Sequence, residues 1–168
     1  MNREEFVDKY GGVYEHSPWV AEQAYDSANA SDERGLAILF AECVDRADAK
    51  TKLTLIRAHP DLAGKAAVAG ELTQDSSEEQ QSAGIDQCTT DEYENFQAMN
   101  EQYKDKYGFP FVMAVRNSAR HKILAAFAER LQNDQVTEAD KAIQEIHKIA
   151  RLRLKVMAID QGTISNDE

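Results

Sequence analysis

Only one stretch of this chain reads as extended backbone, and that feature constrains the fold most. The stretch covers residues 109–115, with the sequence FPFVMAV, and a strand without a partner cannot form a sheet. Elsewhere apolar residues recur at helical spacing, as at Ile123, Phe127 and Leu131. The sequence therefore predicts an all-α fold, arranged as a single-domain helical bundle of about eight helices over residues 1–168.

Capping residues and apolar periodicity predict where individual helices lie. Ser17 before a proline is typical of a helix N-terminus, because the hydroxyl can accept from a first-turn N–H. Thr89 followed by Glu92 is a capping box, and Gly108 is a typical helix end. Ser118 is expected to open a further helix. The predicted helices cover 18–25, about 31–47, 49–58, 90–107, 118–131 and about 137–159.

Charge and composition exclude several classes of partner. The chain carries 19 Lys and Arg against 30 Asp and Glu, a formal net charge of -11. Nucleic acids and anionic membranes need a basic surface, so neither is an expected partner. No run is apolar enough for a membrane span, and residues 1–5 resemble no signal segment. Cys43 and Cys88 lie far apart in the sequence, and we expect both to be reduced thiols. Reduced thiols are typical of the cytoplasm, so we expect a cytoplasmic protein.

His59 is the first candidate for chemistry. An apolar helical run over residues 53–56 leads into it, and Pro60 biases it away from helical backbone. An imidazole at the end of a rigid element and the start of a loop is often functional. The alternative is a histidine with a purely structural role.

Other kinds of chemistry lack the residues they need. His59 and Asp61 are two potential metal ligands, but no HExxH pattern or Cys/His cluster follows, and the other histidines are scattered: His16, His121 and His147. No GxSxG elbow and no glycine-rich phosphate loop is present. We therefore expect acid–base chemistry without a metal or cofactor.

Arg153 lies on the apolar face of the last predicted helix. It follows Ile146, Ile149 and Ala150 by seven, four and three residues, whereas Arg151 projects away from this stripe. A guanidinium among apolar side chains must be paired, because an unpaired buried charge is too costly. Its partner is either an internal carboxylate or an anionic ligand.

A third candidate begins at Ser76. Ser76 and Glu79 fit a capping box, in which Glu79 bonds the backbone of the cap residue. The same helix N-terminus offers N–H groups to an anion, with Ser76 and Gln80 as further hydrogen-bonding groups. Glu79 would then be a first-turn carboxylate that faces a pocket, and the two interpretations are compatible.

Four motifs occur in a set order along the chain. They are His59-Pro60-Asp61-Leu62, then Leu72-Thr73 with Ser76-x-x-Glu79-Gln80-x-x-Ala83-Gly84, then Phe109-Pro110-Phe111-Val112, and finally Arg153-Leu154. Together they resemble the OHCU decarboxylases, which convert 2-oxo-4-hydroxy-4-carboxy-5-ureidoimidazoline (OHCU) to (S)-allantoin in urate degradation. The resemblance covers nearly the whole chain. It implies an all-helical single domain that forms a homodimer and needs no cofactor.

The resemblance also implies roles for individual residues. His59 resembles the catalytic histidine and Glu79 its acidic companion. The positions that resemble substrate contacts are Pro60, Ser76, Ser77, Glu78, Gln80, Phe111, Val112, Met113, Ala114, Val115 and Arg153. Met113 stands where a β-branched residue is expected, which would alter the shape of the pocket but not the chemistry. Two rivals remain: a non-catalytic helical module that binds a small anionic ligand, and a metal-assisted hydrolase built on His59 and Asp61.

Overall fold

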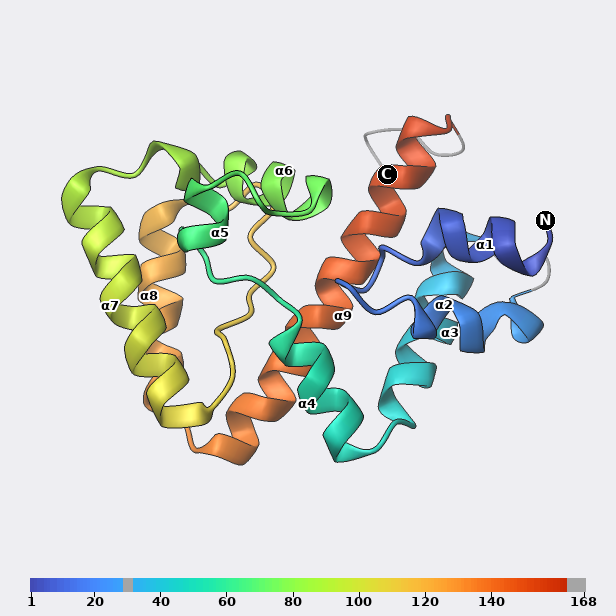
Figure 1. Cartoon of the computed structure of the whole chain (residues 1–168), viewed down its shortest axis with the longest axis horizontal. Coiled ribbons are helices and arrows are strands. Elements are labelled where there is room, and N and C mark those ends of the chain that lie inside the picture. Colours follow the sequence, from blue (N-terminus) through green and yellow to red (C-terminus); the bar gives the residue numbers. More distant parts are fainter. Residues whose placement is uncertain (29–31, 163–168) are drawn as a thin grey trace. The chain divides into compact units, whose positions relative to one another are not determined.

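The computed structural model describes residues 1–28 and 32–162, and within them it is helical without a strand. This confirms the all-α prediction (Figure 1). The α-helices in these residues are α1 (Arg3–Tyr10), α2 (Trp19–Ala24), α3 (Glu33–Asp45), α4 (Ala49–Arg57), α5 (Lys65–Val68), α6 (Gln74–Ser82), α7 (Thr90–Tyr107), α8 (Arg120–Arg130) and α9 (Gln135–Asp160). Two short 3₁₀ segments, η1 (Tyr25–Ser27) and η2 (Ile85–Gln87), complete the list. None of these helices is long and apolar enough to span a bilayer.

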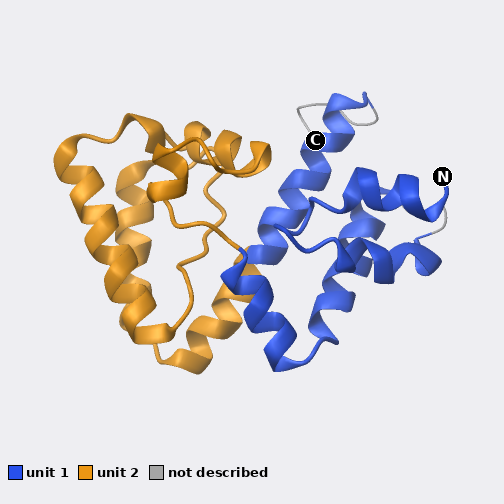
Figure 2. Cartoon of the chain, in the orientation of Figure 1, with its two compact units in different colours: residues 1–58, 146–168 blue, residues 59–145 orange. Residues whose placement is uncertain are grey.

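The chain divides into two compact units (Figure 2). Unit 1 contains residues 1–58 and the chain from Ile146 onward, and unit 2 contains His59–Glu145. One division follows α4 and the other falls within α9. That residues 1–168 form a single domain stays a prediction, and each unit is described by itself below.

Unit 1 packs α1, α2 and α3 around aromatic side chains. The Phe6 ring meets the Phe40 ring edge-on, with centroids 6.2 Å apart, and Tyr14 approaches the same Phe40 ring. Asp32 caps α3 by accepting from the Gly35 N–H at 2.8 Å. Residue 31, where the helix is predicted to begin, lies outside the described residues.

Unit 2 contains the long helix α7, and here the predicted caps are confirmed. Thr89 and Glu92 form the capping box, and Gly108 ends α7 in the left-handed region with φ of 79°. α8 packs against α7. The rings of Phe111 and Phe127 stack with centroids 3.8 Å apart, and Tyr103 meets both rings edge-on. Residues 110–115, in the segment predicted as extended, belong to no helix and no sheet, and Phe109 lies in a bend.

Three predicted helix starts are wrong in detail. The Ser17 hydroxyl donates to the Glu15 carbonyl instead of capping α2, which begins after Pro18. The cap of α8 is Ala119 and not Ser118. α9 begins at Gln135, two residues before the predicted start, because Asp134 accepts from the Thr137 N–H at 2.8 Å.

Candidate active site

His59 lies just past the end of α4, in a loop that runs to Gly64. Ala58 is the last residue with helical backbone, and His59 is buried, with 8 % of its surface exposed. Ala63 in the same loop has a φ of +53°, a region that residues other than glycine rarely adopt. The predicted break before Pro60 is confirmed, and the imidazole is more deeply buried than a loop position suggests.

Three side-chain amides hold this loop. The Gln80 carboxamide accepts from the Ala63 N–H at 3.1 Å and donates to the Asp61 carbonyl at 3.3 Å. Gln97 donates to the Ala63 carbonyl at 2.6 Å, and Asn100 donates to the Leu62 carbonyl at 2.9 Å. Buried backbone groups outside a helix or sheet need such partners. The segment that carries His59 is therefore fixed by α6 and α7.

The capping box predicted at Ser76 and Glu79 is wrong. Thr73 is the N-cap of α6, and its hydroxyl accepts from the Ser76 N–H at 3.2 Å. The Ser77 N–H donates to the Thr73 carbonyl, as in any first helical turn. Threonine is also a favoured capping residue, and the helix starts three residues earlier than predicted. The N–H groups of Ser76 and Ser77 are consequently engaged within α6.

Glu79 lies in the interior of α6 and is buried, with 7 % of its surface exposed. Its Oε2 atom lies 3.7 Å from Nη2 of Arg116, a residue that the sequence analysis missed. The Ser82 hydroxyl donates to the Glu79 carbonyl and accepts from the Asn117 N–H. The turn after residue 115 is thus tied to α6. The one signal in the sequence was an arginine directly after the extended apolar run.

The extended segment 109–115 also belongs to unit 2, and side chains of that unit bond to its backbone. The Val112 carbonyl accepts from Nη1 of Arg130, and the Ala114 N–H donates to Glu145 at 3.3 Å. Met113 and Ala114 are half-buried, and the other residues of the segment are buried. Among the described residues, no hydrogen-bond partner is recorded for the Met113 amide or carbonyl.

Arg153 belongs to unit 1, whereas the other predicted site residues belong to unit 2. It is 3 % exposed, which confirms that it faces the core, and Arg151 is exposed as predicted. Nη2 of Arg153 donates to the Glu15 carboxylate at 2.9 Å, and Nη1 donates to the Gly12 carbonyl at 3.0 Å. An internal carboxylate is therefore one partner of this guanidinium.

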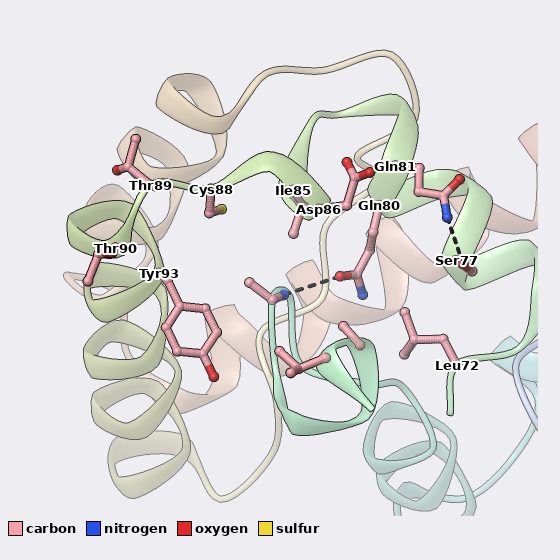
Figure 3. Close-up of a pocket in the computed structure, with 13 residues that line it drawn as sticks. Leu72, Ser77, Gln80, Gln81, Ile85, Asp86, Cys88, Thr89, Thr90 and Tyr93 are labelled. Atoms are coloured by element: carbon pink, nitrogen blue, oxygen red, sulfur yellow. Dashed lines mark hydrogen bonds between the residues drawn. The ribbon is translucent and has the colours of Figure 1, made fainter. Parts of the chain in front are cut away.

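A cavity of about 510 Å³ opens in unit 2 beside α6 (Figure 3). Its wall comes from α5, α6, η2 and the start of α7, with apolar groups from Leu72, Ile85 and Tyr93. Ser77 and Gln80 are the predicted site residues that line it. Figure 3 shows the Gln80 carboxamide directed toward the backbone of the His59 loop, and Gln81 bonded to Ser77.

The remaining histidines are distributed as the sequence suggests, and the described residues contain no group of three potential metal ligands. His147 nevertheless has defined partners within unit 1. Its Nδ1 lies 2.8 Å from the Tyr14 hydroxyl, and its Nε2 lies 2.9 Å from Asp45. Burial raises the pKa of Tyr14, so its hydroxyl keeps its proton and can donate it to His147. No pattern in the sequence predicted this chain of hydrogen bonds.

Comparison with known proteins shows the family to which this chain belongs. The family model described as OHCU decarboxylase matches residues 1–155. A 2-oxo-4-hydroxy-4-carboxy-5-ureidoimidazoline decarboxylase of Halalkalicoccus jeotgali is 40% identical, over 94% of this chain and 88% of that protein. The protein of the same name from Haloferax volcanii is 42% identical, over 92% of this chain and 89% of its own length.

Two solved structures are similar. The crystal structure of (S)-allantoin synthase superposes with a TM-score of 0.74 at 32% identity, over 93% of this chain. This chain spans 50% of that longer chain. The crystal structure of an OHCU decarboxylase in the presence of (S)-allantoin superposes with a TM-score of 0.68 over 83% of this chain and 89% of its own. At 20% identity, the second likeness concerns the fold alone.

Proposed function

Because the chain belongs to the OHCU decarboxylase family, we propose that it converts OHCU to (S)-allantoin in urate degradation. It is a carboxy-lyase that works without a cofactor. The observation that carries this proposal is the buried imidazole of His59, in a loop fixed by three amides, in a chain with decarboxylase relatives along almost its full length.

The reaction needs little beyond an anion site and one proton donor. The substrate loses its carboxylate as CO₂, and the electron pair of the broken C–C bond moves into the adjacent imine-like ring. The resulting carbanion equivalent then takes a proton on one face, which sets the (S) configuration. His59 is the donor of that proton, because an imidazole titrates near neutral pH.

Glu79 is the acidic partner of His59 in this proposal. Its burial, and the Arg116 guanidinium at 3.7 Å, support a carboxylate held in one place. A charged side chain fixed before the substrate arrives needs no reorganisation during the reaction. Either it orients the imidazole, or it disfavours the bound substrate carboxylate.

Substrate recognition falls to a set of side chains and to one extended backbone segment. Pro60, Ser76, Ser77, Glu78 and Gln80 line the substrate, and residues 111–115 meet its ureido and ring amides through their backbone. The peptide groups of Met113, a half-buried residue, form no hydrogen bond within the described residues, which supports this assignment. Arg153 binds the substrate's carbonyl or ureido oxygens, and the active protein is a cytoplasmic homodimer.

The test is the optical activity of the product. OHCU generated freshly from urate is mixed with EDTA-treated protein, and the circular dichroism of allantoin is followed. We expect a strong (S)-allantoin signal. It should be lost in His59→Asn and kept in His121→Asn, which alters an exposed histidine of the same unit. OHCU also decays spontaneously to racemic allantoin, so the stereochemistry is a better readout than the rate.

Each other outcome rejects a stated part of the proposal. Racemic product at the spontaneous rate would reject the enzyme and favour a module that binds a small anion. Activity that disappears with EDTA and returns with a divalent metal would favour the metal-assisted reaction on His59 and Asp61. Full activity in His59→Asn would remove the imidazole from the mechanism.

A further inference from the structure

Arg130 is a buried cation that the proposed mechanism does not use. It lies at the end of α8 with 5 % of its surface exposed, and its Nε donates to Glu138 Oε1 at 2.8 Å. Its Nη1 donates to the Val112 carbonyl, and its guanidinium carbon lies 4.3 Å from the centre of the Phe111 ring. One side chain therefore contacts two consecutive residues of the extended segment.

Glu138 holds the guanidinium in this orientation. It is fully buried and accepts from the Tyr103 hydroxyl at 2.6 Å and from Asn133 at 2.9 Å, besides Arg130. Burial, followed by the hydrogen bond to Glu138, raises the pKa of Tyr103, so the phenol stays a donor. With three donors on one carboxylate, this buried ion pair meets the condition under which such pairs persist.

A second side chain forms a hydrogen bond with the backbone of the same segment, two residues further on. Glu145, on α9 and 5 % exposed, accepts from the Ala114 N–H at 3.3 Å. The two contacts enclose Met113, whose peptide groups have no recorded partner among the described residues. An extended backbone with no neighbouring strand depends on such side-chain contacts to set the direction of its N–H and C=O groups.

We infer that Arg130 is a positioning residue that orients the Met113 backbone toward the substrate. Glu138 holds the Arg130 guanidinium in place, and Glu145 holds the backbone on the C-terminal side of Met113. This inference rests on the proposed function, in which residues 111–115 contact the substrate. Arg130 acts through the Val112 carbonyl and has no contact with the reacting atoms. Its effect therefore falls on substrate binding and on the stereochemistry of protonation, and less on the rate of each turnover.

The test compares Arg130→Lys with wild type in the (S)-allantoin assay. Lysine keeps the charge but has one nitrogen, so it cannot bond Glu138 and the Val112 carbonyl in the forked geometry of arginine. We expect KM to rise about tenfold or more, kcat to change less than threefold, and the enantiomeric excess of the product to fall. The matched control is Tyr107→Phe. It removes the hydrogen bonds from the Tyr107 hydroxyl to the Arg130 and Asn133 carbonyls but leaves the extended segment untouched.

The control separates positioning from simple destabilisation. Both variants should lower Tm, but only Arg130→Lys should raise KM, because a protein that is merely less stable binds substrate normally in its folded fraction. If Arg130→Lys fails to fold, Glu138→Gln serves instead. That variant keeps Arg130 and removes the charge that holds its Nε, and we expect a smaller rise in KM.

A KM equal to that of wild type in a folded Arg130→Lys or Glu138→Gln would overturn the inference. So would an equal rise in KM in Tyr107→Phe. Failure of the proposed function is distinct, because wild-type protein would then give no (S)-allantoin signal before any variant is measured.

Discussion

The position of Glu79 within α6 determines what its carboxylate can do. At the third position of a capping box its oxygens would bond backbone N–H groups, as Glu92 does with the Thr89 N–H at 3.1 Å. Because Thr73 caps α6 instead, Glu79 lies further along the helix, with Arg116 at 3.7 Å. Its carboxylate therefore lies near a residue from another part of the chain and not at the start of its own helix.

Glu79→Gln tests which role the carboxylate has. If Glu79 orients His59, we expect kcat to fall roughly 100-fold or more with KM unchanged. If it disfavours the bound substrate carboxylate, KM falls together with kcat, because the amide no longer repels that group. Steady-state kinetics on the formation of (S)-allantoin distinguish the two. Glu94→Gln on the exposed face of α7 is the control, and wild-type constants in Glu79→Gln would exclude both roles.

Arg153 has an internal partner in Glu15, so its proposed contact with the substrate needs a test of its own. Arg153→Lys should lose one of the two hydrogen bonds, to Glu15 or to the Gly12 carbonyl, and lower the free energy of unfolding by about 1–3 kcal/mol. We also expect KM to rise. Urea unfolding and kinetics are measured beside Arg151→Lys, which alters an exposed arginine of the same helix. Lower stability with an unchanged KM would leave Arg153 with a structural role only.

At the scale of helices, the sequence predicted best those helix boundaries that are set by capping residues and apolar spacing. α7 has the capping box at Thr89, the apolar spacing and the left-handed Gly108 that were expected. α4 begins at Ala49 as predicted, with Asp48 as its cap. These signals act within one or two turns, so no knowledge of the remaining fold is needed.

Prediction was poorer where two local solutions compete or where a helix is short. Thr73 and Ser76 are both good caps, and the choice between them depends on the burial of Glu79 and Gln80, which sequence spacing does not show. α1 and α5, with eight and four residues, have too little apolar pattern to be identified. α1 buries Phe6 against the rest of unit 1.

Helix caps give the fold a defined sensitivity to acid. Hydrogen bonds from Thr137, the backbone N–H foremost, lower the pKa of Asp134, and the bond from the Thr89 backbone N–H lowers that of Glu92. A carboxylate with a lowered pKa in the folded state stabilises the protein above its ordinary pKa. That contribution is lost as the pH falls through the lowered value. We expect Tm to fall between about pH 5 and about pH 3.

Asp134→Asn is the informative variant for this effect. Asparagine can still accept from the Thr137 N–H but does not titrate, so part of the decline in Tm with acid should disappear. Asp105→Asn, an exposed position on α7, is the matched control. Parallel Tm curves for Asp134→Asn and wild type across this range would contradict the assignment.

At the scale of the whole molecule, the sequence predicted candidate site residues but not the partners that hold them. His59, Glu79 and Arg153 were identified from a helix break, a local spacing and a helical face, and all three are buried. Their partners, such as Arg116 and Glu15, lie 37 and 138 positions away in the sequence. Contacts of that range arise from packing, and no local pattern encodes them.

The proposed homodimer is a property of the whole chain with a measurable salt dependence. Each copy carries a formal charge of -11, so two copies repel one another unless salt screens them. We expect sedimentation to show twice the 18.8 kDa chain mass at about 0.15 M salt. The monomer fraction should be larger at about 0.01 M salt. Only monomer at every salt concentration would reject the dimer.

The loop that carries His59 also has a consequence for how the gene tolerates mutation. Gln80, Gln97 and Asn100 each hold it through an amide N–H that donates to a backbone carbonyl. A single nucleotide change converts any of these codons to that of the matching acid, which keeps the shape and replaces the donor with a second acceptor. Such a change would set a carboxylate oxygen against a carbonyl oxygen and release the loop. We therefore expect these three amides, none of them proposed to react, to be as sensitive to such mutations as the histidine whose loop they hold.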